Sequence, residues 1–253
     1  MKTRFLSQTA LFALLATSLP TYADVVGGFP GRTVYAAENN GTAAEAFYKS
    51  YEDGSAPGIR LSHRYNADIL VFADAIQLTQ EGDELGSRDD FDGTVFGVGA
   101  MYFKPDLLEG YDAAFSASYH TGEISTGRTD VDFPGTNLRI ENWELNSDVT
   151  EIALQLIISS RKPLAANGLQ WYAGVGVHRL EIDPSVNGGV VNVNTPDGSQ
   201  INLNQAIADS GTSETEFGAT AGVVLPTSFG HMYAAAESID GTILGVGVRY
   251  NLK

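Results

Sequence analysis

The chain has 253 residues, no cysteine and a formal net charge of −16. The absence of cysteine excludes disulfides and thiolate metal sites. The acidic balance argues against nucleic acid as a partner, because phosphate binding needs a basic face. The mean hydropathy of −0.07 is that of an ordinary soluble protein, but the alternating strands of a membrane barrel average an apolar and a polar face to a similar value.

The first 23 residues have the pattern of a secretory signal peptide. Lys2 and Arg4 form a basic start, residues 6–19 are mostly apolar, and Ala23 ends a suitable cleavage site. The apolar core is shorter than the roughly 20 residues that a membrane-spanning helix needs. We therefore predict export and removal of residues 1–23, which takes two cations and no acid from −16 and leaves −18. Residues 24–42 are predicted to be a lead-in segment or a first strand, and residues 43–253 the main domain.

After the lead-in, apolar residues occupy alternate positions in a series of short segments, as in strands with two different faces. The clearest is residues 242–252, in which Leu244, Val246 and Val248 alternate with glycine or polar residues. The first strand is ambiguous between residues 43–51, which also fit a helical turn, and residues 32–37. In chain order, the other predicted strands cover residues 59–65, 69–80, 94–104, 111–120, 150–160, 169–177, 216–225, 231–239 and 242–252.

The connections between these segments alternate in length. Short turns are predicted at residues 66–68, 105–110, 162–168 and 226–230, and long polar loops at 81–92, 121–148 and 183–213. This sorting is typical of a transmembrane β-barrel, which also has an even number of strands when both chain ends lie on one side. We predict an all-β, antiparallel up-and-down transmembrane barrel of about ten strands, with eight as the alternative. If the apolar faces formed a core instead, the fold would be a soluble lipocalin-like barrel.

The signal peptide, the strand repeats over residues 59–252 and the ending at 247–252 together resemble a small Gram-negative outer-membrane β-barrel of the OmpA/OmpX-like, porin-family type. The resemblance implies that Gly247, Tyr250 and Leu252 form the signal read by the barrel-assembly machinery. The chain has Leu252 where the family has a terminal phenylalanine, and Lys253 follows it. The resemblance also implies a monomer in the outer membrane of a Gram-negative bacterium, in contact with membrane lipid and lipopolysaccharide.

The strand faces opposite the apolar ones carry most of the charged residues within the predicted strands. If the apolar faces meet lipid, these charges point into a barrel that is about narrow enough for side chains to fill it. Unpaired buried charges are costly, so we predict an ion-pair network that plugs the lumen. Glycines on the same faces would leave space for a pore or for bulky side chains of other strands. The predicted members of the network are Arg60, Arg64, Asp74, Asp112, Glu151, Glu216, Glu237 and Arg249.

Two groups of residues could support chemistry. Ser118, His120 and Glu123 include the residue types needed for acyl transfer, but they match no barrel-enzyme motif, and we interpret the first two as polar filler of the lumen. An acidic loop lacks the spacing of a defined calcium loop, and we interpret it as solvated. We predict no catalytic residue, metal site or cofactor. The acidic residues of this loop are Asp83, Glu84, Asp89, Asp90 and Asp92.

The predicted function is that of a non-catalytic integral outer-membrane barrel that presents acidic surface loops for envelope integrity, adhesion or ligand binding. The alternative is a narrow porin-like channel for ions or small solutes. A lipid A-modifying or proteolytic barrel enzyme is the less favoured third reading. Aromatic residues near strand ends suit an interfacial girdle. They are Tyr102, Phe103, Tyr111, Trp171 and Tyr250.

Overall fold

The computed structural model describes residues 41–51, 54–80, 91–126, 129–132, 139–187, 192–194, 200–202, 211–239 and 241–252. The predicted signal peptide, the alternative first strand at 32–37 and most of the acidic loop at 81–92 lie outside these residues. Within the described part of the chain, no helix is long and apolar enough to cross a membrane.

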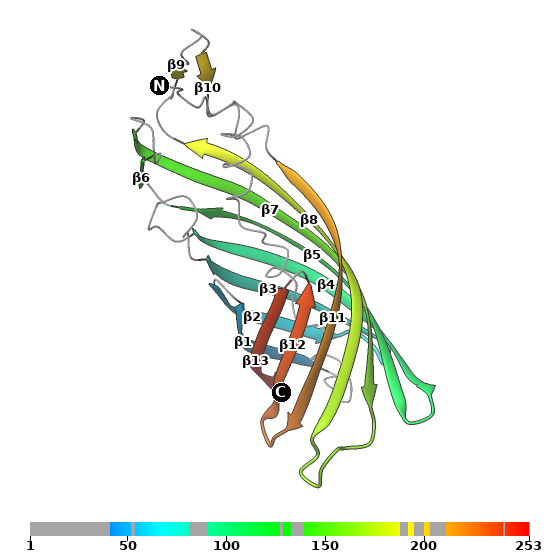
Figure 1. Cartoon of the computed structure of the whole chain (residues 1–253). Coiled ribbons are helices and arrows are strands. Elements are labelled where there is room, and N and C mark those ends of the chain that lie inside the picture. Colours follow the sequence, from blue (N-terminus) through cyan, green and yellow to red (C-terminus); the bar gives the residue numbers. More distant parts are fainter. Residues whose placement is uncertain are drawn as a thin grey trace, which may run out of the picture.

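Ten antiparallel strands close into a barrel (Figure 1). Neighbours in sequence pair around the wall, β1 pairs with β13, and β5 pairs with β7. The prediction of ten antiparallel strands is confirmed, residues 42–51 are a strand rather than a helical turn, and the eight-strand alternative is wrong. The strands are β1 (Thr42–Tyr51), β2 (Gly54–Arg64), β3 (Ile69–Gln80), β4 (Phe91–Leu108), β5 (Tyr111–Ser125), β7 (Arg139–Ser160), β8 (Gln170–Asn187), β11 (Thr212–Pro226), β12 (Gly230–Ile239) and β13 (Gly241–Leu252).

Three shorter strands lie outside this ring. β6 (Thr129–Asp132) pairs with the first part of β7. β9 (Asn192–Asn194) and β10 (Gln200–Asn202) form a separate two-stranded sheet.

The barrel wall is taller on one side than the sequence predicted. β5 continues to Ser125, opposite Asn146 of β7, and β7 pairs with β8 as far as Glu144 and Asn187. The predicted loops at 121–148 and 183–213 are therefore wrong at their ends. Backbone pairing continues beyond the apolar segments because it does not depend on side-chain polarity. β4, β5, β7, β8 and β11 thus rise beyond β12, β13, β1 and β2 (Figure 1).

Strand β3 shows how the two faces are assigned. Asp74 shares a face with Leu70 and Phe72, and all three are buried, whereas Ile69 and Val71 are exposed. The predicted inward direction of Asp74 is confirmed. The interior is therefore not purely polar, because large apolar side chains point inward together with the charged ones.

Local side-chain chemistry fixes the short turns. Asn66 Oδ1 accepts hydrogen bonds from the backbone N–H groups of Asp68 and Ile69, both at 2.9 Å, which closes the turn between β2 and β3. Gly110, between β4 and β5, has φ of +81°, a conformation that favours glycine. These turns hold the register of the neighbouring strands.

Candidate functional site

The outer face of the barrel carries a belt of exposed apolar side chains. Leu154 is 58% exposed, Val175 60% and Phe217 83%. On β11 the belt runs from Phe217 to Leu225, which is roughly 20 Å along the barrel axis at about 3.4 Å per residue and a tilt of about 40°. A lipid-facing apolar band is about 25 Å tall. We name this surface the apolar belt; other exposed members are Tyr48, Ile59, Leu61, Ile69, Val71, Phe96, Val98, Phe115, Tyr119, Ile152, Met232, Leu244, Val246 and Val248.

Polar side chains begin at one end of the apolar belt. On β5 and β7, Thr121 and Thr150 face outward and lie opposite each other, with their hydroxyl oxygens 3.4 Å apart. On β8, Arg179 is exposed and its Nη2 lies 2.7 Å from Glu181 Oε1. On β5, β7 and β8 the outward side chains change from apolar to polar within one or two residues, so the belt has a sharp upper edge there.

Aromatic residues lie at the other end of the apolar belt. Tyr65, Tyr102 and Tyr250 are exposed, and Tyr111 contacts Trp171 edge to face, with ring centroids 5.9 Å apart. Phe103 does not belong to this girdle, because it is 4% exposed and points inward. Side chains of consecutive strand residues point to opposite faces, so Phe103 cannot share the face of Tyr102.

Inside the barrel, charged residues of opposite sign lie directly opposite one another on successive strands. Glu45 of β1 is paired in register with Arg249 of β13 on one side and with Arg60 of β2 on the other. The register pairs then continue through β3, β4 and β5 to β7. We name this set the charge row. In order around the barrel it comprises Arg249, Glu45, Arg60, Asp74, Gly97, His120 and Glu151.

The contacts within the charge row are close and buried. Arg60 Nε donates to Asp74 Oδ2 at 2.9 Å, and a second guanidinium nitrogen, Nη2, donates to the same oxygen. His120 Nε2 lies 3.2 Å from Asp74 Oδ1, and His120 Nδ1 lies 3.4 Å from Glu151 Oε2. The side chains of Asp74, His120 and Glu151 are fully buried.

From Glu151 the polar contacts cross the lumen. Glu151 Oε1 lies 2.7 Å from His178 Nδ1. Gln155 Nε2 lies 3.1 Å from His178 Nε2 and 3.4 Å from Glu237 Oε1 on β12. The chain of contacts thus joins β7, β8 and β12 across the interior.

The buried charges nearly balance. Lys49, Arg60 and Arg249 supply three cations, and four carboxylates are buried with them. An imidazole that lies between two carboxylates, as His120 does, can donate from both nitrogens when it is protonated. With one proton added to His120, these buried positive and negative charges sum to zero. The four buried carboxylates are Glu45, Asp74, Glu151 and Glu237.

Five of the eight predicted network residues, Arg60, Asp74, Glu151, Glu237 and Arg249, are buried inside the barrel. Of the other three, Arg64 and Asp112 lie at the ends of β2 and β5 and differ from the prediction, whereas Glu216 is on the inward face of β11 and half-buried.

Arg64 is half-buried and donates to the carbonyls of Asn66 and Ala67 in the turn. Asp112 Oδ1 accepts from Arg161 Nε at 2.6 Å at the rim, and this hydrogen bond raises the pKa of Arg161 above its ordinary value. Glu216 is half-buried, in register with His178.

Glycines of the inward face lie against large side chains of neighbouring strands. A Cβ atom at Gly222 would meet the Tyr172 hydroxyl at 2.5 Å, and Cβ atoms at Gly247 and Gly99 would meet the rings of Tyr233 and Phe72. Tyr172 is only 1% exposed. The space left by these glycines is therefore occupied by aromatic rings from adjacent strands.

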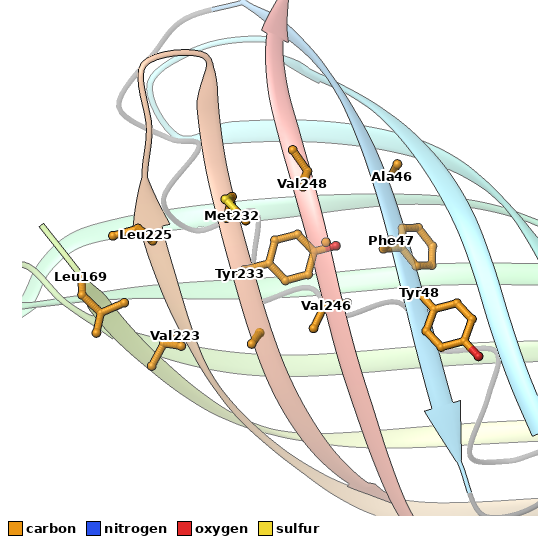
Figure 2. Close-up of a pocket in the computed structure, with 12 residues that line it drawn as sticks. Ala46, Phe47, Tyr48, Leu169, Val223, Leu225, Met232, Tyr233, Val246 and Val248 are labelled. Carbon is orange, nitrogen blue, oxygen red and sulfur yellow. The ribbon is translucent and has the colours of Figure 1, made fainter. Parts of the chain in front are cut away.

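The seam between the first and last strands shows the same arrangement. Tyr233 of β12 lies beside Gly247 of β13, and its hydroxyl donates to Glu45 Oε1 of β1 at 2.8 Å. Figure 2 shows the Tyr233 ring crossing β13 toward β1. A groove of about 580 Å³ crosses this seam from β1 over β13 and β12 to β11, and its lining includes outward residues of the apolar belt such as Tyr48 and Val246.

The residues considered for chemistry do not assemble into a catalytic site. Ser118 and His120 face inward, but Glu123 is exposed on the outer face because it is an odd number of residues from both. Asp92 is exposed in β4, and the other acids of its predicted loop lie outside the described residues. Among described residues, no three His, Asp or Glu side chains are arranged to hold a metal ion.

Sequence reasoning missed several interior residues. Glu45 and Lys49 are on β1, whose strand character was ambiguous, and His178 lies just after the predicted strand at 169–177 and was not among the predicted network residues. The alternation of β1 places both charges on the face of Phe47, so the signal was present once β1 was accepted as a strand.

Comparisons with protein-family models and with curated protein sequences gave no match. Among solved structures, the chain is similar to the translocator domain of autotransporter NalP from Neisseria meningitidis, with 14% identity, 88% of this chain and 94% of that chain covered, and a TM-score of 0.49. It is also similar to the N-terminal β-barrel domain of Pseudomonas aeruginosa OprF, with 15% identity, 85% and 98% covered, and a TM-score of 0.34. Neisserial surface protein A gives 13% identity, 83% and 96% covered, and a TM-score of 0.35. At these low values the function must be inferred from the barrel itself.

Proposed function

We propose that the protein is a non-catalytic, integral outer-membrane β-barrel of a Gram-negative bacterium, with a closed lumen and an acidic wall above the membrane. The observation that carries this proposal is the apolar belt on the outside of a closed barrel whose interior is already filled. In water, exposed apolar surface of this extent marks an interaction site or a membrane contact. A belt that encircles the barrel between polar residues and aromatic residues fits lipid.

The taller side of the wall suits the external side of the membrane. Short turns lie at the opposite end of the barrel, as in outer-membrane barrels on their periplasmic side. Above the belt, Glu123, Asp148 and Asp183 lie directly opposite one another on β5, β7 and β8 and face outward. This acidic wall would present negative charge at the cell surface for envelope integrity, adhesion or ligand binding.

A closed lumen is the favoured state because its glycine spaces are occupied. Tyr172 and Tyr233 fill the gaps beside Gly222 and Gly247, and the charge row follows the inner wall from β13 to β7. These contacts support a structural plug rather than a solute path.

Placing a charge on the apolar belt tests the membrane assignment. We expect Leu154→Arg to lower the free energy of unfolding in lipid by about 2–4 kcal/mol, because an arginine near the bilayer midplane loses its hydration. The amount of folded, heat-modifiable protein in the outer-membrane fraction should fall accordingly. The matched control is Asp148→Arg, on the same strand and face but above the belt, which should be tolerated. Equal tolerance of both changes, or recovery of soluble protein from the periplasm, would contradict the assignment.

Conductance in planar bilayers tests the closed lumen. We expect no discrete openings from the native protein, and openings after Tyr172→Ala with Tyr233→Ala, because both rings fill the lumen. The control removes two outward rings instead, Tyr48→Ala with Tyr119→Ala. Stable openings of the native protein would favour the channel alternative and overturn the closed-lumen proposal.

A further inference from the structure

The seam between β1 and β13 joins the first and last strands of the barrel. A hairpin turn fixes the register of a strand pair, and β12 and β13 are separated by one residue, β1 and β2 by two. No turn joins β1 to β13. The register of barrel closure must therefore be specified by side chains.

Four inward pairs lie along the seam. Ala43 is opposite Asn251, Glu45 opposite Arg249, Phe47 opposite Gly247, and Lys49 opposite Gly245. Each pair combines opposite charges or a large side chain with a small one. A register change that keeps the inward face inward must move the strands by two residues.

Size complementarity at Phe47 does not distinguish the native register from one of its two nearest alternatives. If β1 slips by two residues so that Phe47 faces Gly245, the ring still has a glycine opposite it. Glu45 then faces Gly247, and Arg249 faces Ala43, so their direct opposition is lost. In the opposite slip, Phe47 faces Arg249 and Glu45 faces Asn251. Among these seam pairs, only the charged one is broken by both slips.

The charged pair is also held from both sides. Glu45 receives the Tyr233 hydroxyl at 2.8 Å and lies in register with Arg60, while its Oε2 is 3.9 Å from Arg249 Nη1. Both side chains are at least 96% buried. Separating such charges in a buried place is costly. We propose that the Glu45–Arg249 pair selects the register in which the barrel closes.

Cross-linking between two introduced cysteines measures the register directly, because the chain contains no other cysteine. Ala46 is opposite Val248 on the outer face. A short bifunctional thiol reagent should link Ala46→Cys to Val248→Cys in the native seam and should fail to link Ala46→Cys to Val246→Cys. In the full-length folded protein, Arg249→Met should lower the native cross-link and raise the Val246 or Tyr250 one severalfold, whereas Arg249→Lys should restore the native pattern.

A second variant, in which the acid of β1 is moved and which we name the recoded seam, decides the question if Arg249→Met does not fold. Ala43→Glu with Glu45→Ala moves the acid by two residues, so the cross-link should shift from Val248→Cys to Val246→Cys. The control is Asp74→Asn, which breaks the charge row at a hairpin-fixed pair and should weaken the barrel without changing the cross-link. If Arg249→Met and the recoded seam both cross-link only in the native register, or the recoded seam yields no folded barrel, the proposal is overturned.

Discussion

Arg60→Met is expected to lower the free energy of unfolding by about 3–5 kcal/mol, because it leaves a buried carboxylate without its cation. Arg60 donates two hydrogen bonds to Asp74, whose side chain is fully buried, and lies in register with Glu45. Glu45 and Asp74 would then face the interior with no cation between them. Urea unfolding in lipid vesicles, followed by tryptophan fluorescence and gel mobility, measures the loss.

A second substitution separates pairing from packing. Arg60→Met with Asp74→Asn removes one charge of each sign, so the sum inside the barrel is unchanged and much of the stability should return. Arg161→Met is the control for loss of an arginine, because its ion pairs with Asp106 and Asp112 lie at the exposed rim and should contribute little. If the double substitution were as destabilising as Arg60→Met alone, the loss would arise from packing of the arginine against the Phe72 ring, 4.0 Å away.

Gly97→Val should be of similar severity, with a loss of about 3 kcal/mol or more from overpacking and from separation of buried charges. A Cβ atom at residue 97 would occupy the positions of Asp74 Oδ1 and the His120 ring. The glycine is the member of the charge row that has no side chain, and its neighbours on either side meet across the gap. Unfolding in urea would measure the effect.

The control for Gly97→Val lies on the same strand. Ala100 is exposed on the outer face of β4, so Ala100→Val adds similar bulk where no side chain is displaced and should leave stability almost unchanged. Gly97→Ala should give an intermediate loss. If Gly97→Val and Ala100→Val behaved alike, the close contact of Asp74 and His120 through the gap would not contribute to stability.

The interior could be anticipated only in part. Alternation on β3 correctly predicts that Asp74 points inward with Leu70 and Phe72, because strand residues two apart share a face. The same rule placed Asp112 on an inward face, yet Asp112 contacts Arg161 at the rim. Alternation gives the direction of a side chain but not its height along the barrel, which depends on strand tilt and register.

The glycines illustrate the same limit. The sequence showed that Gly222 and Gly247 face inward, and left open whether a pore or another strand's side chain uses their space. The structure places Tyr172 and Tyr233 there. Those tyrosines are distant in sequence from the gaps they fill on the neighbouring strand, so pairing had to be known first.

The sequence by itself indicated an all-β chain of about ten two-faced strands, with eight as the alternative, and short turns at one end, because each of these follows from local periodicity and turn chemistry. Only the tertiary structure decided that the wall extends into the predicted loops, and that Glu45, His120 and His178 join the buried charges. The charge row exists only when β1 meets β13 in one register, and that is a property of the closed barrel rather than of any single strand.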